Sequence, residues 1–128
     1  MELTYSLAGD LLERYRRAWL DFEGDAFVDL FTDDVVYHDD PFGEPHVGKL
    51  ALRAYLLDAA EVQDQLEVEF ERHWVVPPTI VAVWHASYVH RRTHNRVRLS
   101  GVLVVEIARD GRIERLREWH HRRETPVG

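Results

Sequence analysis

The chain of 128 residues contains no cysteine and no long apolar segment. Without thiols it cannot form disulfides, use a catalytic thiolate or hold a metal through cysteine. No stretch approaches the roughly 20 consecutive apolar residues that a membrane-spanning helix needs. The first ten residues also lack the basic region of a signal peptide. We therefore expect a cytoplasmic protein without a membrane partner.

Positive charge is also scarce in this sequence. Lys and Arg number 16 against 23 Asp and Glu, so the formal net charge is −7. A negative chain is a poor partner for nucleic acids and anionic membranes, and we expect neither. The basic pairs Arg91-Arg92 and Arg122-Arg123 are interpreted as solvated strand ends. With 45% hydrophobic residues the chain can build one core, which predicts a single domain over residues 1–128.

Three amphipathic helices are predicted in the first half of the chain. Apolar residues recur at steps of three and four from Leu7 to Phe22, and the helix is expected to stop near Gly24. Asp25 is predicted to be the N-cap of a short second helix. A third helix follows Gly48. The positions expected to be buried are Leu7, Leu11, Tyr15, Ala18, Trp19 and Phe22, then Phe27, Leu30 and Phe31, then Leu52, Tyr55, Leu56 and Ala59.

Beyond Gln63 the spacing of apolar residues changes from 3.6 to 2, which is typical of strands. Hairpin turns are predicted at residues 92–95 and 109–111, the second of which contains Asp-Gly. A frayed tail is predicted at residues 124–128. The predicted strands cover residues 35–39, residues from 66 up to Pro77-Pro78, and residues 80–91, 97–107 and 112–122.

The strands at residues 80–91 and 97–107 are apolar on both faces, so both faces need a cover. The helices can cover one face. A second copy of the chain would cover the other, which predicts a homodimer through the outer sheet face, unless the sheet is fully buried within one chain. The order of elements predicts an α+β domain whose helices lie on one side of a curved, mostly antiparallel sheet and enclose a small-molecule pocket.

The segment at residues 30–48 is the most informative part of the chain, because a predicted strand there ends in the ionisable residues His-Asp-Asp just before a proline. A carboxylate held in an apolar pocket has a raised pKa, which suits a general base. Alternatively, Asp39 and Asp40 are turn residues, one capping backbone N–H groups and the other solvated. Strand parity leaves the inward residue open, since Asp39 shares a face with Tyr37 and Asp40 shares a face with His38.

A second polar group lies on the last predicted strand. Glu118 and His120, if inward, can form an acid/base pair or orient a water. The apolar Ile113 and Trp119 have the opposite parity, however, so Glu118 faces inward only if a bulge shifts the strand. The sequence has eight histidines but no compact ligand motif, and we expect no metal.

Four segments carry a family resemblance: residues 13–15 (Glu-Arg-Tyr), residues 30–39, residues 48–55, and the Asp-Gly-Arg-Ile run at 110–113 before Arg-Glu-Trp at 117–119. They resemble the nuclear transport factor 2-like superfamily, and within it SnoaL-like and ketosteroid-isomerase-like proteins. This resemblance implies a cone-shaped sheet around a pocket. It does not fix an activity, because the scaffold hosts isomerases, cyclases, dehydratases, epoxide hydrolases and binding modules.

In ketosteroid isomerases a strand-end Asp before Pro is the base, and a Tyr of the first helix stabilises the enolate oxygen with a protonated Asp of the sheet. The resemblance therefore implies Asp39 or Asp40 as base and Tyr15 as hydroxyl donor. Leu103 stands at the position of the sheet Asp, so that oxyanion hole is incomplete here.

Glu118 matches an Asp that positions water in the epoxide-hydrolase branch. Trp84 and Ala86 stand near the positions of its partner Arg and Asp, and neither can take those roles. The chain therefore lacks part of the residue set of both the ketosteroid isomerases and the epoxide hydrolases.

These patterns predict a small-molecule enzyme that needs no cofactor and moves a proton on a largely apolar oxygenated compound, as an isomerase or cyclase does. Asp39 or Asp40 takes the proton, Tyr15 donates to the developing oxyanion, and Glu118 with His120 assists. The alternative is a non-catalytic small-molecule-binding or dimerisation module of the same fold. The residues expected to bind the substrate are Trp19, Tyr37, His38, Tyr55, Trp84, Tyr88 and Leu103.

Overall fold

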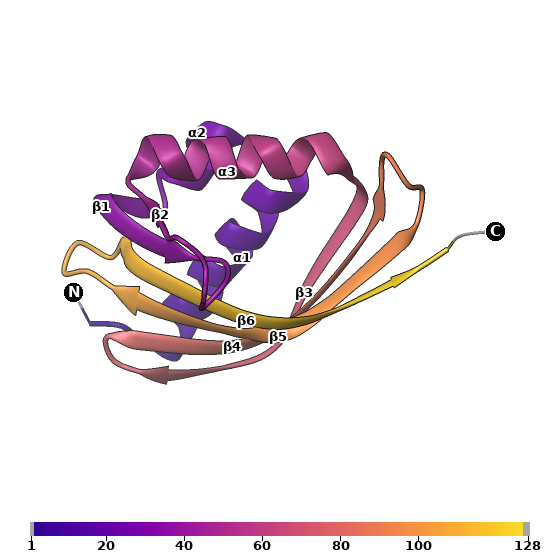
Figure 1. Cartoon of the computed structure of the whole chain (residues 1–128). Helices are drawn as coiled ribbons and strands as arrows, with labels where there is room; N and C mark the ends of the chain where they lie inside the picture. The colour runs from indigo at the N-terminus through magenta and orange to yellow at the C-terminus, as the bar shows by residue number, and fades with distance from the viewer. Residues whose placement is uncertain (1, 127–128) are drawn as a thin grey trace.

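The computed structural model describes residues 2–126 as three helices and a curved, six-stranded sheet (Figure 1). The helices lie together on the concave side of the sheet. The elements in chain order are α1 (Tyr5–Asp21), α2 (Gly24–Val28), β1 (Phe31–His38), β2 (His46–Val47), α3 (Lys49–Val62), β3 (Gln63–Val76), β4 (Thr79–His90), β5 (Arg96–Ile107) and β6 (Ile113–Thr125).

The sheet has the strand order β2-β1-β6-β5-β4-β3. The strands β3 to β6 form an antiparallel meander, while β1 joins the far edge of β6 in parallel and β2 pairs antiparallel with β1. Because β1 follows the first helices and β6 ends the chain, their pairing closes the helices against the sheet. The predicted α+β class, with a curved and mostly antiparallel sheet, is confirmed.

Helix α1 begins and ends as its flanking residues dictate. The Thr4 side chain accepts a hydrogen bond from the N–H of Leu7, and Phe22 adopts a left-handed conformation that ends the helix. Leu7 was expected to be buried, but it is 42% exposed. Ala8 and Leu12 are buried instead, because the buried stripe is rotated toward them.

The second helix begins earlier than its predicted cap. Glu23, rather than Asp25, is the N-cap, and its carboxylate accepts from the backbone N–H of Asp25. Asp25 forms an ion pair with Arg53 that ties α2 to α3. The prediction of Asp25 as N-cap was therefore wrong by two residues.

Strand β1 starts at Phe31 and ends at His38, which makes it longer than the predicted strand at residues 35–39. The following turn contains β2, which the sequence did not predict because it has only two residues. Gly48 then has a φ of 84°, a conformation that favours glycine, and its N–H donates to the Val35 carbonyl at 2.9 Å. This turn directs the chain into α3.

Strand β6 carries one extra residue relative to β5. The pair Ile107–Ile113 is followed directly by the pair Glu106–Arg115, so the residue between them is unpaired and the side-chain parity reverses. As a result Ile113 and Glu118 are both buried on the helix side of the sheet. The bulge that was needed to turn Glu118 inward is present.

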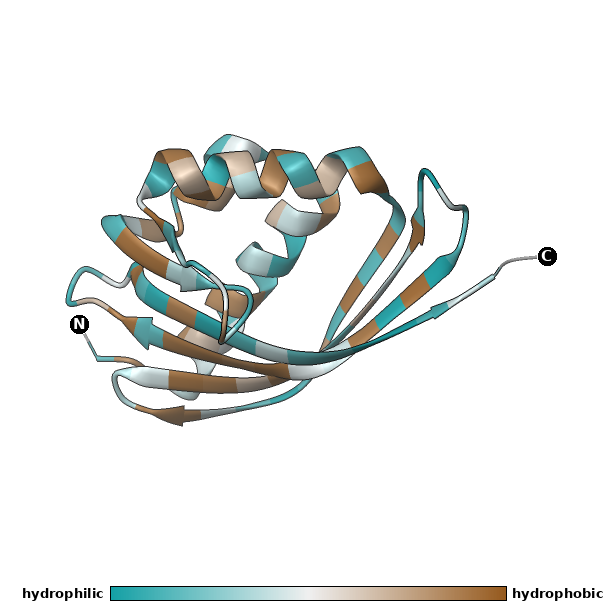
Figure 2. Cartoon of the chain, in the orientation of Figure 1, coloured by the Kyte–Doolittle hydropathy of each residue, from teal (hydrophilic) through white to brown (hydrophobic). Residues whose placement is uncertain are grey.

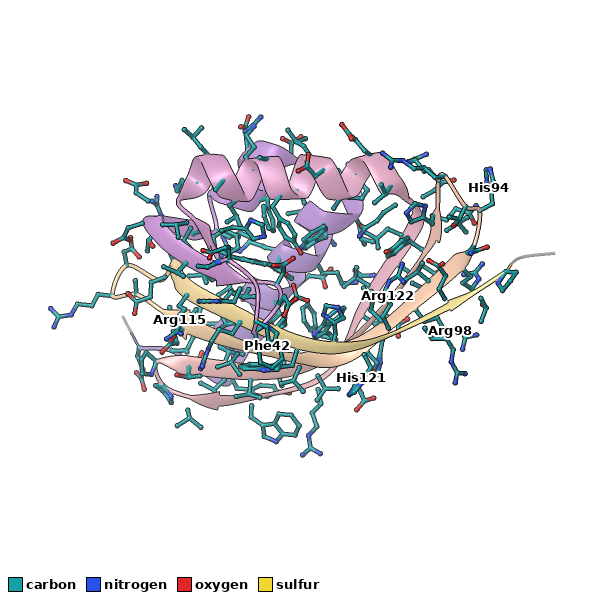
Figure 3. The ribbon with its side chains drawn as sticks, viewed as in Figure 1. Phe42, His94, Arg98, Arg115, His121 and Arg122 are labelled. Carbon is teal, nitrogen blue, oxygen red and sulfur yellow. The ribbon has the colours of Figure 1, made fainter. Side chains whose placement is uncertain are left out.

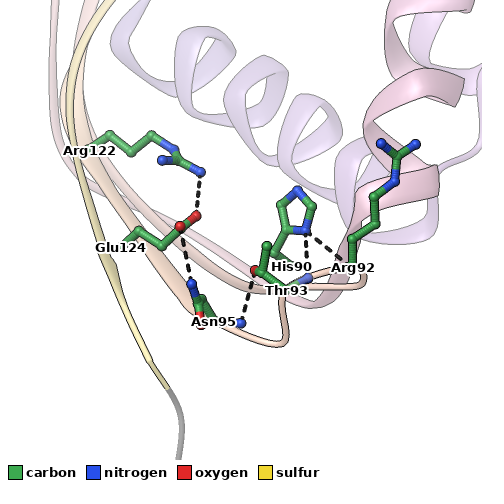
Figure 4. A network of polar contacts seen from close by, with 6 residues as sticks. All are labelled: His90, Arg92, Thr93, Asn95, Arg122 and Glu124. Atoms are coloured by element: carbon green, nitrogen blue, oxygen red, sulfur yellow. Dashed lines mark hydrogen bonds and ion pairs between the residues drawn. The ribbon is translucent and has the colours of Figure 1, made fainter.

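The predicted frayed tail is wrong as far as the described residues go. Strand β6 continues to Thr125, and Glu124 accepts hydrogen bonds from Asn95 at 3.2 Å and from Arg122 at 2.8 Å (Figure 4). In the same hairpin, His90 accepts from the backbone N–H groups of residues 92 and 93. Residues 127 and 128 lie outside the described part.

The hydrophobic core lies between the helices and the concave face of the sheet. Apolar and polar residues alternate along much of the sheet, and long apolar stretches occupy β4 and β5 (Figure 2). Helix α1 packs on the sheet through Leu11 and Leu12, and α3 packs through Leu52 and Leu56. Within residues 2–126, none of the helices combines the length and the apolar character needed to cross a bilayer.

Candidate functional site

A cavity of about 70 Å³ lies between the concave face of the sheet and the helices α1 and α3. It has room for a few water molecules or a slender ligand. Its walls are mostly aromatic and aliphatic, with a single carboxylate. The lining residues are Tyr15, Trp19, Tyr55, Gln63, Leu66, Val68, Phe70, Trp84, Ala86, Leu99, Leu103 and Glu118.

Glu118 is the one charged side chain in this lining, and only 7% of the residue is exposed. Its Oε1 lies 3.5 Å from the Tyr37 hydroxyl, which donates to it. Its Oε2 lies 3.4 Å from Nδ1 of His120, whose side chain is 30% exposed. The carboxyl group is thus held between an interior hydroxyl and a histidine that reaches toward solvent.

Tyr15 extends this polar chain into the helix layer. The Tyr15 and Tyr37 hydroxyl oxygens are 2.6 Å apart, and both residues are buried. Because Tyr37 donates its proton to Glu118, its oxygen accepts the proton of Tyr15. A hydrogen-bonded chain therefore runs from α1 through β1 to the carboxylate on β6.

Burial raises the pKa of Glu118, and the negative charge of Asp39 raises it further. His120 acts in the opposite direction, but the pKa of Glu118 stays above its ordinary value. The hydrogen bond to Glu118 in turn raises the pKa of His120. The two groups can share a proton, since the states Glu⁻/His⁺ and neutral Glu/neutral His hold the same number of protons.

The tyrosines around the cavity stay neutral. Burial raises the pKa of Tyr15, and the negative charge of Glu118 adds to this effect. Burial likewise raises the pKa of Tyr37 and of Tyr55. These residues therefore act as hydrogen-bonding hydroxyls and not as bases.

Gly101 allows Trp84 and His120 to meet across strand β5. It pairs with Trp84 on one side and with His120 on the other, and the two rings lie edge to face with centroids 5.9 Å apart. A Cβ atom at Gly101 would lie 1.9 Å from the carbonyl oxygen of Trp119. Only glycine fits this close approach of the two strands.

The two aspartates of the strand end do not line the cavity. Asp40 is exposed, and its carboxylate accepts from the backbone N–H of Phe42 at 2.9 Å, which is turn chemistry. Asp39 follows the last residue of β1 and pairs with His46 at 3.3 Å. The carboxylate that lines the cavity is that of Glu118.

The other predicted wall residues divide into two groups. Trp19, Tyr55, Trp84 and Leu103 line the cavity as expected. Three do not: Tyr37 is fully buried behind the wall, His38 lies in a depression on the other face of β1, and Tyr88 lies outside the lining.

Gln63 at the junction of α3 and β3 lines the cavity, and no sequence pattern had marked it as a functional residue. The apolar strand pattern contained Leu66, Val68 and Phe70, but only as core residues. Gln63 would have been recognisable from the sequence if it stood in a strong turn motif or interrupted an apolar run. It does neither. Among residues 2–126 no three His, Asp or Glu side chains converge as a metal site requires.

Residues 12–116 match the sequence model of a family described as the SnoaL-like domain. No curated protein is recognisably similar in sequence. The match begins within α1 and ends near the start of β6, so it includes the whole cavity lining except Glu118.

Solved structures share the fold at low sequence identity. RV0760c from Mycobacterium tuberculosis is 19% identical with a TM-score of 0.79, covering 97% of this chain and 100% of that one. An LEH-like epoxide hydrolase from the same organism is 20% identical with a TM-score of 0.76, covering 91% and 84%. The epoxide hydrolase/cyclase-like enzyme SalBIII has a role in pyran ring formation in the polyether salinomycin. It is 18% identical with a TM-score of 0.78, and the match covers 88% of this chain and 89% of SalBIII. At these identities the likeness shows an α+β fold of the nuclear transport factor 2-like type.

Proposed function

The chain belongs to the SnoaL-like domain family, and on this premise we propose that it is an enzyme that moves a proton on a small, largely apolar oxygenated compound, as isomerases and cyclases do. The reaction proposed needs no cofactor. The fold is shared with a cyclase-like enzyme and an epoxide hydrolase, which supports a small-molecule substrate.

The observation that carries this proposal is the buried carboxyl group of Glu118 at the cavity wall. A carboxylate whose pKa is raised by burial is a stronger base than one in water, and it operates nearer neutral pH. In the proposed first step Glu118 takes a proton from the carbon next to a substrate carbonyl. The electron pair of the broken C–H bond moves onto the carbonyl oxygen and forms an enolate.

Two outcomes complete the reaction. Glu118 returns its proton to a different carbon of a conjugated enolate while the carbonyl re-forms, which isomerises the compound. Alternatively, the enolate carbon attacks a second carbonyl, the π electron pair of that carbonyl moves onto its oxygen, and Glu118 gives its proton to the resulting alkoxide, which closes a ring. Tyr37 orients the carboxylate through its hydrogen bond, and Tyr15 supports Tyr37. His120 compensates the charge of Glu118 and connects it to solvent. In this scheme Tyr15 is a positioning residue, because its proton is already engaged with Tyr37.

Proton abstraction can be tested without knowing the natural substrate. Small ketones and enones, such as 2-heptanone and cyclohex-2-enone, exchange the hydrogens next to the carbonyl for deuterium in D₂O, and NMR follows the exchange. We expect the protein to accelerate this exchange. Glu118→Gln should slow the catalysed exchange by about 100-fold, within the usual range for loss of a general base.

Glu114→Gln is the matched control, since Glu114 is an exposed glutamate on the same strand. It should leave the exchange rate unchanged. Equal exchange by the wild type and Glu118→Gln would contradict the proposal. Binding of the ketones with no acceleration by the wild type would assign the chain to the non-catalytic binding modules of this fold.

A further inference from the structure

Two polar atoms at the cavity wall have no hydrogen-bond partner within residues 2–126. They are Nε1 of the Trp84 indole and Oε1 of the Gln63 amide. Both atoms are buried, and Trp84 as a whole is only 7% exposed. Buried polar groups in folded proteins are nearly always paired, because an unpaired group loses its hydration without compensation. Both atoms therefore call for a partner from outside the chain.

The chemistry of the two atoms is complementary. An indole N–H can only donate a hydrogen bond, and an amide oxygen can only accept one. The Tyr15 hydroxyl donates to Tyr37 and is not available to a ligand while that chain holds. Among the lining residues, the buried donor without a partner within residues 2–126 is the N–H of Trp84.

The two atoms lie toward different ends of the cavity. Trp84 sits at the middle of β4 and contacts His120, the partner of Glu118. Gln63 pairs with His90 at the hairpin end of β4. The wall between these positions is apolar and includes Leu66, Val68, Ala86 and Leu99. The cavity is therefore polar at two ends and apolar between them.

We propose that the cavity binds a slender, bifunctional compound with a carbonyl oxygen at one end, an apolar middle and a hydroxyl group at the other end. The carbonyl oxygen accepts from Trp84, which places the adjacent carbon beside Glu118, and the hydroxyl group donates to Gln63. This inference rests on the proposed function only for the choice of a carbonyl next to Glu118. Binding itself needs no turnover.

The test compares 2-heptanone with 7-hydroxyheptan-2-one, which adds the terminal hydroxyl group. NMR of ¹⁵N-labelled protein shows the indole N–H signals of the tryptophans. The signal that is absent from the spectrum of Trp84→Phe is that of Trp84. Both compounds should move the Trp84 indole proton to lower field, as a new hydrogen bond does. The hydroxy ketone should bind about tenfold more tightly, the gain expected from one buried hydrogen bond.

Gln63→Leu should reduce this tenfold preference to less than twofold and leave the Trp84 shift in place. Gln65→Asn is the matched control, since Gln65 is exposed on the same strand and should keep the preference. Glu118→Gln should also keep the preference for the hydroxy ketone, although the same change slows the proposed proton exchange, so the two proposals can fail independently. Either of two results with the wild-type protein overturns the inference: a Trp84 signal that does not move, or equal affinities for the two ketones. Neither result depends on the folding of the Gln63 or Glu118 variants.

Discussion

At the scale of single residues, the hydroxyl group of Tyr37 joins two buried partners, Tyr15 and Glu118. Tyr37→Phe removes this link and leaves the Tyr15 hydroxyl without its acceptor in the core. We expect it to lower the free energy of unfolding by about 1–3 kcal/mol, the usual cost of a buried unpaired group. Urea unfolding measures the change. Tyr5→Phe, at a tyrosine that is 63% exposed, should have almost no effect, and an equal loss in both variants would contradict the role of Tyr37.

The Glu118–His120 pair should make stability depend on pH. Folding raises both pKa values above their ordinary values of 4.5 and 6.5. A group with a raised pKa in the folded state stabilises the fold below its unfolded pKa, and this contribution is lost as the pH rises through the folded pKa. The free energy of unfolding of the wild type, relative to Glu118→Gln, should therefore be highest below about pH 4.5 and fall as the pH rises. Urea unfolding across this range tests the slope, and a constant difference would show that Glu118 and His120 are not shifted.

The sequence predicted carboxylates near the cavity but did not decide which of them lines it. A carboxylate in an apolar pocket was expected at Asp39 or Asp40, because a proline follows them and the resemblance implied a base there. The local turn decided otherwise, since Asp40 caps its own turn and Asp39 pairs with His46. Glu118 took the inward position only because of a bulge, which depends on the pairing of two strands and leaves no mark in the local sequence.

At the scale of elements, the close approach of β5 and β6 depends on Gly101. Gly101→Ala places a methyl group against the backbone of β6 and must push the strands apart. We expect a loss of about 1–3 kcal/mol in the free energy of unfolding, as for other forced overpacking. A weakened contact between Trp84 and His120 should accompany it.

Gly43→Ala is the control for Gly101→Ala, because a Cβ at this exposed turn makes only ordinary contacts. Its free energy of unfolding should stay within about 0.5 kcal/mol of the wild type. Thermal or urea unfolding of both variants provides the measurement. A Gly101→Ala protein as stable as the wild type would mean that β6 can shift freely, and the geometry around Glu118 would then not be fixed.

Most of the elements followed from local patterns, and the exceptions have physical causes. The helices at α1 and α3 and the strands β3 to β5 were predicted from their apolar spacing. Strand β2 is too short to show any period. The pairing of β6 with β1 is a contact between distant parts of the chain, and it lengthens β1 toward Phe31 in a way that local spacing cannot indicate.

At the scale of the whole molecule, the outer face of the sheet has an ordered pattern of side chains. Pairing aligns Trp74, Val81 and Val104 in one row across the strands, and Val83, Val102 and Trp119 in the next. Trp74 and Trp119 are 43% and 40% exposed. The rows toward the hairpin end are polar. Arg98 and His121, on the side away from the helices, belong to these rows (Figure 3).

We propose that a second copy of the chain covers this face. In the polar rows, Glu67 and Glu69 stand on β3 at one edge of the face, whereas Arg98 and Arg123 stand on β5 and β6. A twofold axis through the face would place the acidic edge of one copy against the basic side of the other. The apolar rows would then be buried at the centre.

Light scattering after gel filtration tests this association, and we expect twice the mass of one chain. Reversing Glu67 and Glu69 to Arg should produce single chains, because arginines then face arginines. Adding Arg98→Glu and Arg123→Glu to that variant should restore the pair by restoring complementarity. A wild-type protein that runs as a single chain at tens of micromolar, or a charge reversal without effect, would contradict the proposed dimer.

We propose the buried carboxyl group of Glu118 as the acid/base group of the cavity. The most direct measurement is a pH titration of the Glu118 side-chain ¹³C signal, made together with the pH dependence of ketone deuterium exchange by the same protein. We predict that Glu118 titrates above its ordinary value of 4.5 and that the exchange rate rises with the same pKa. Titration of Glu118 at its ordinary value, or an exchange rate that does not follow its ionisation, would contradict the account.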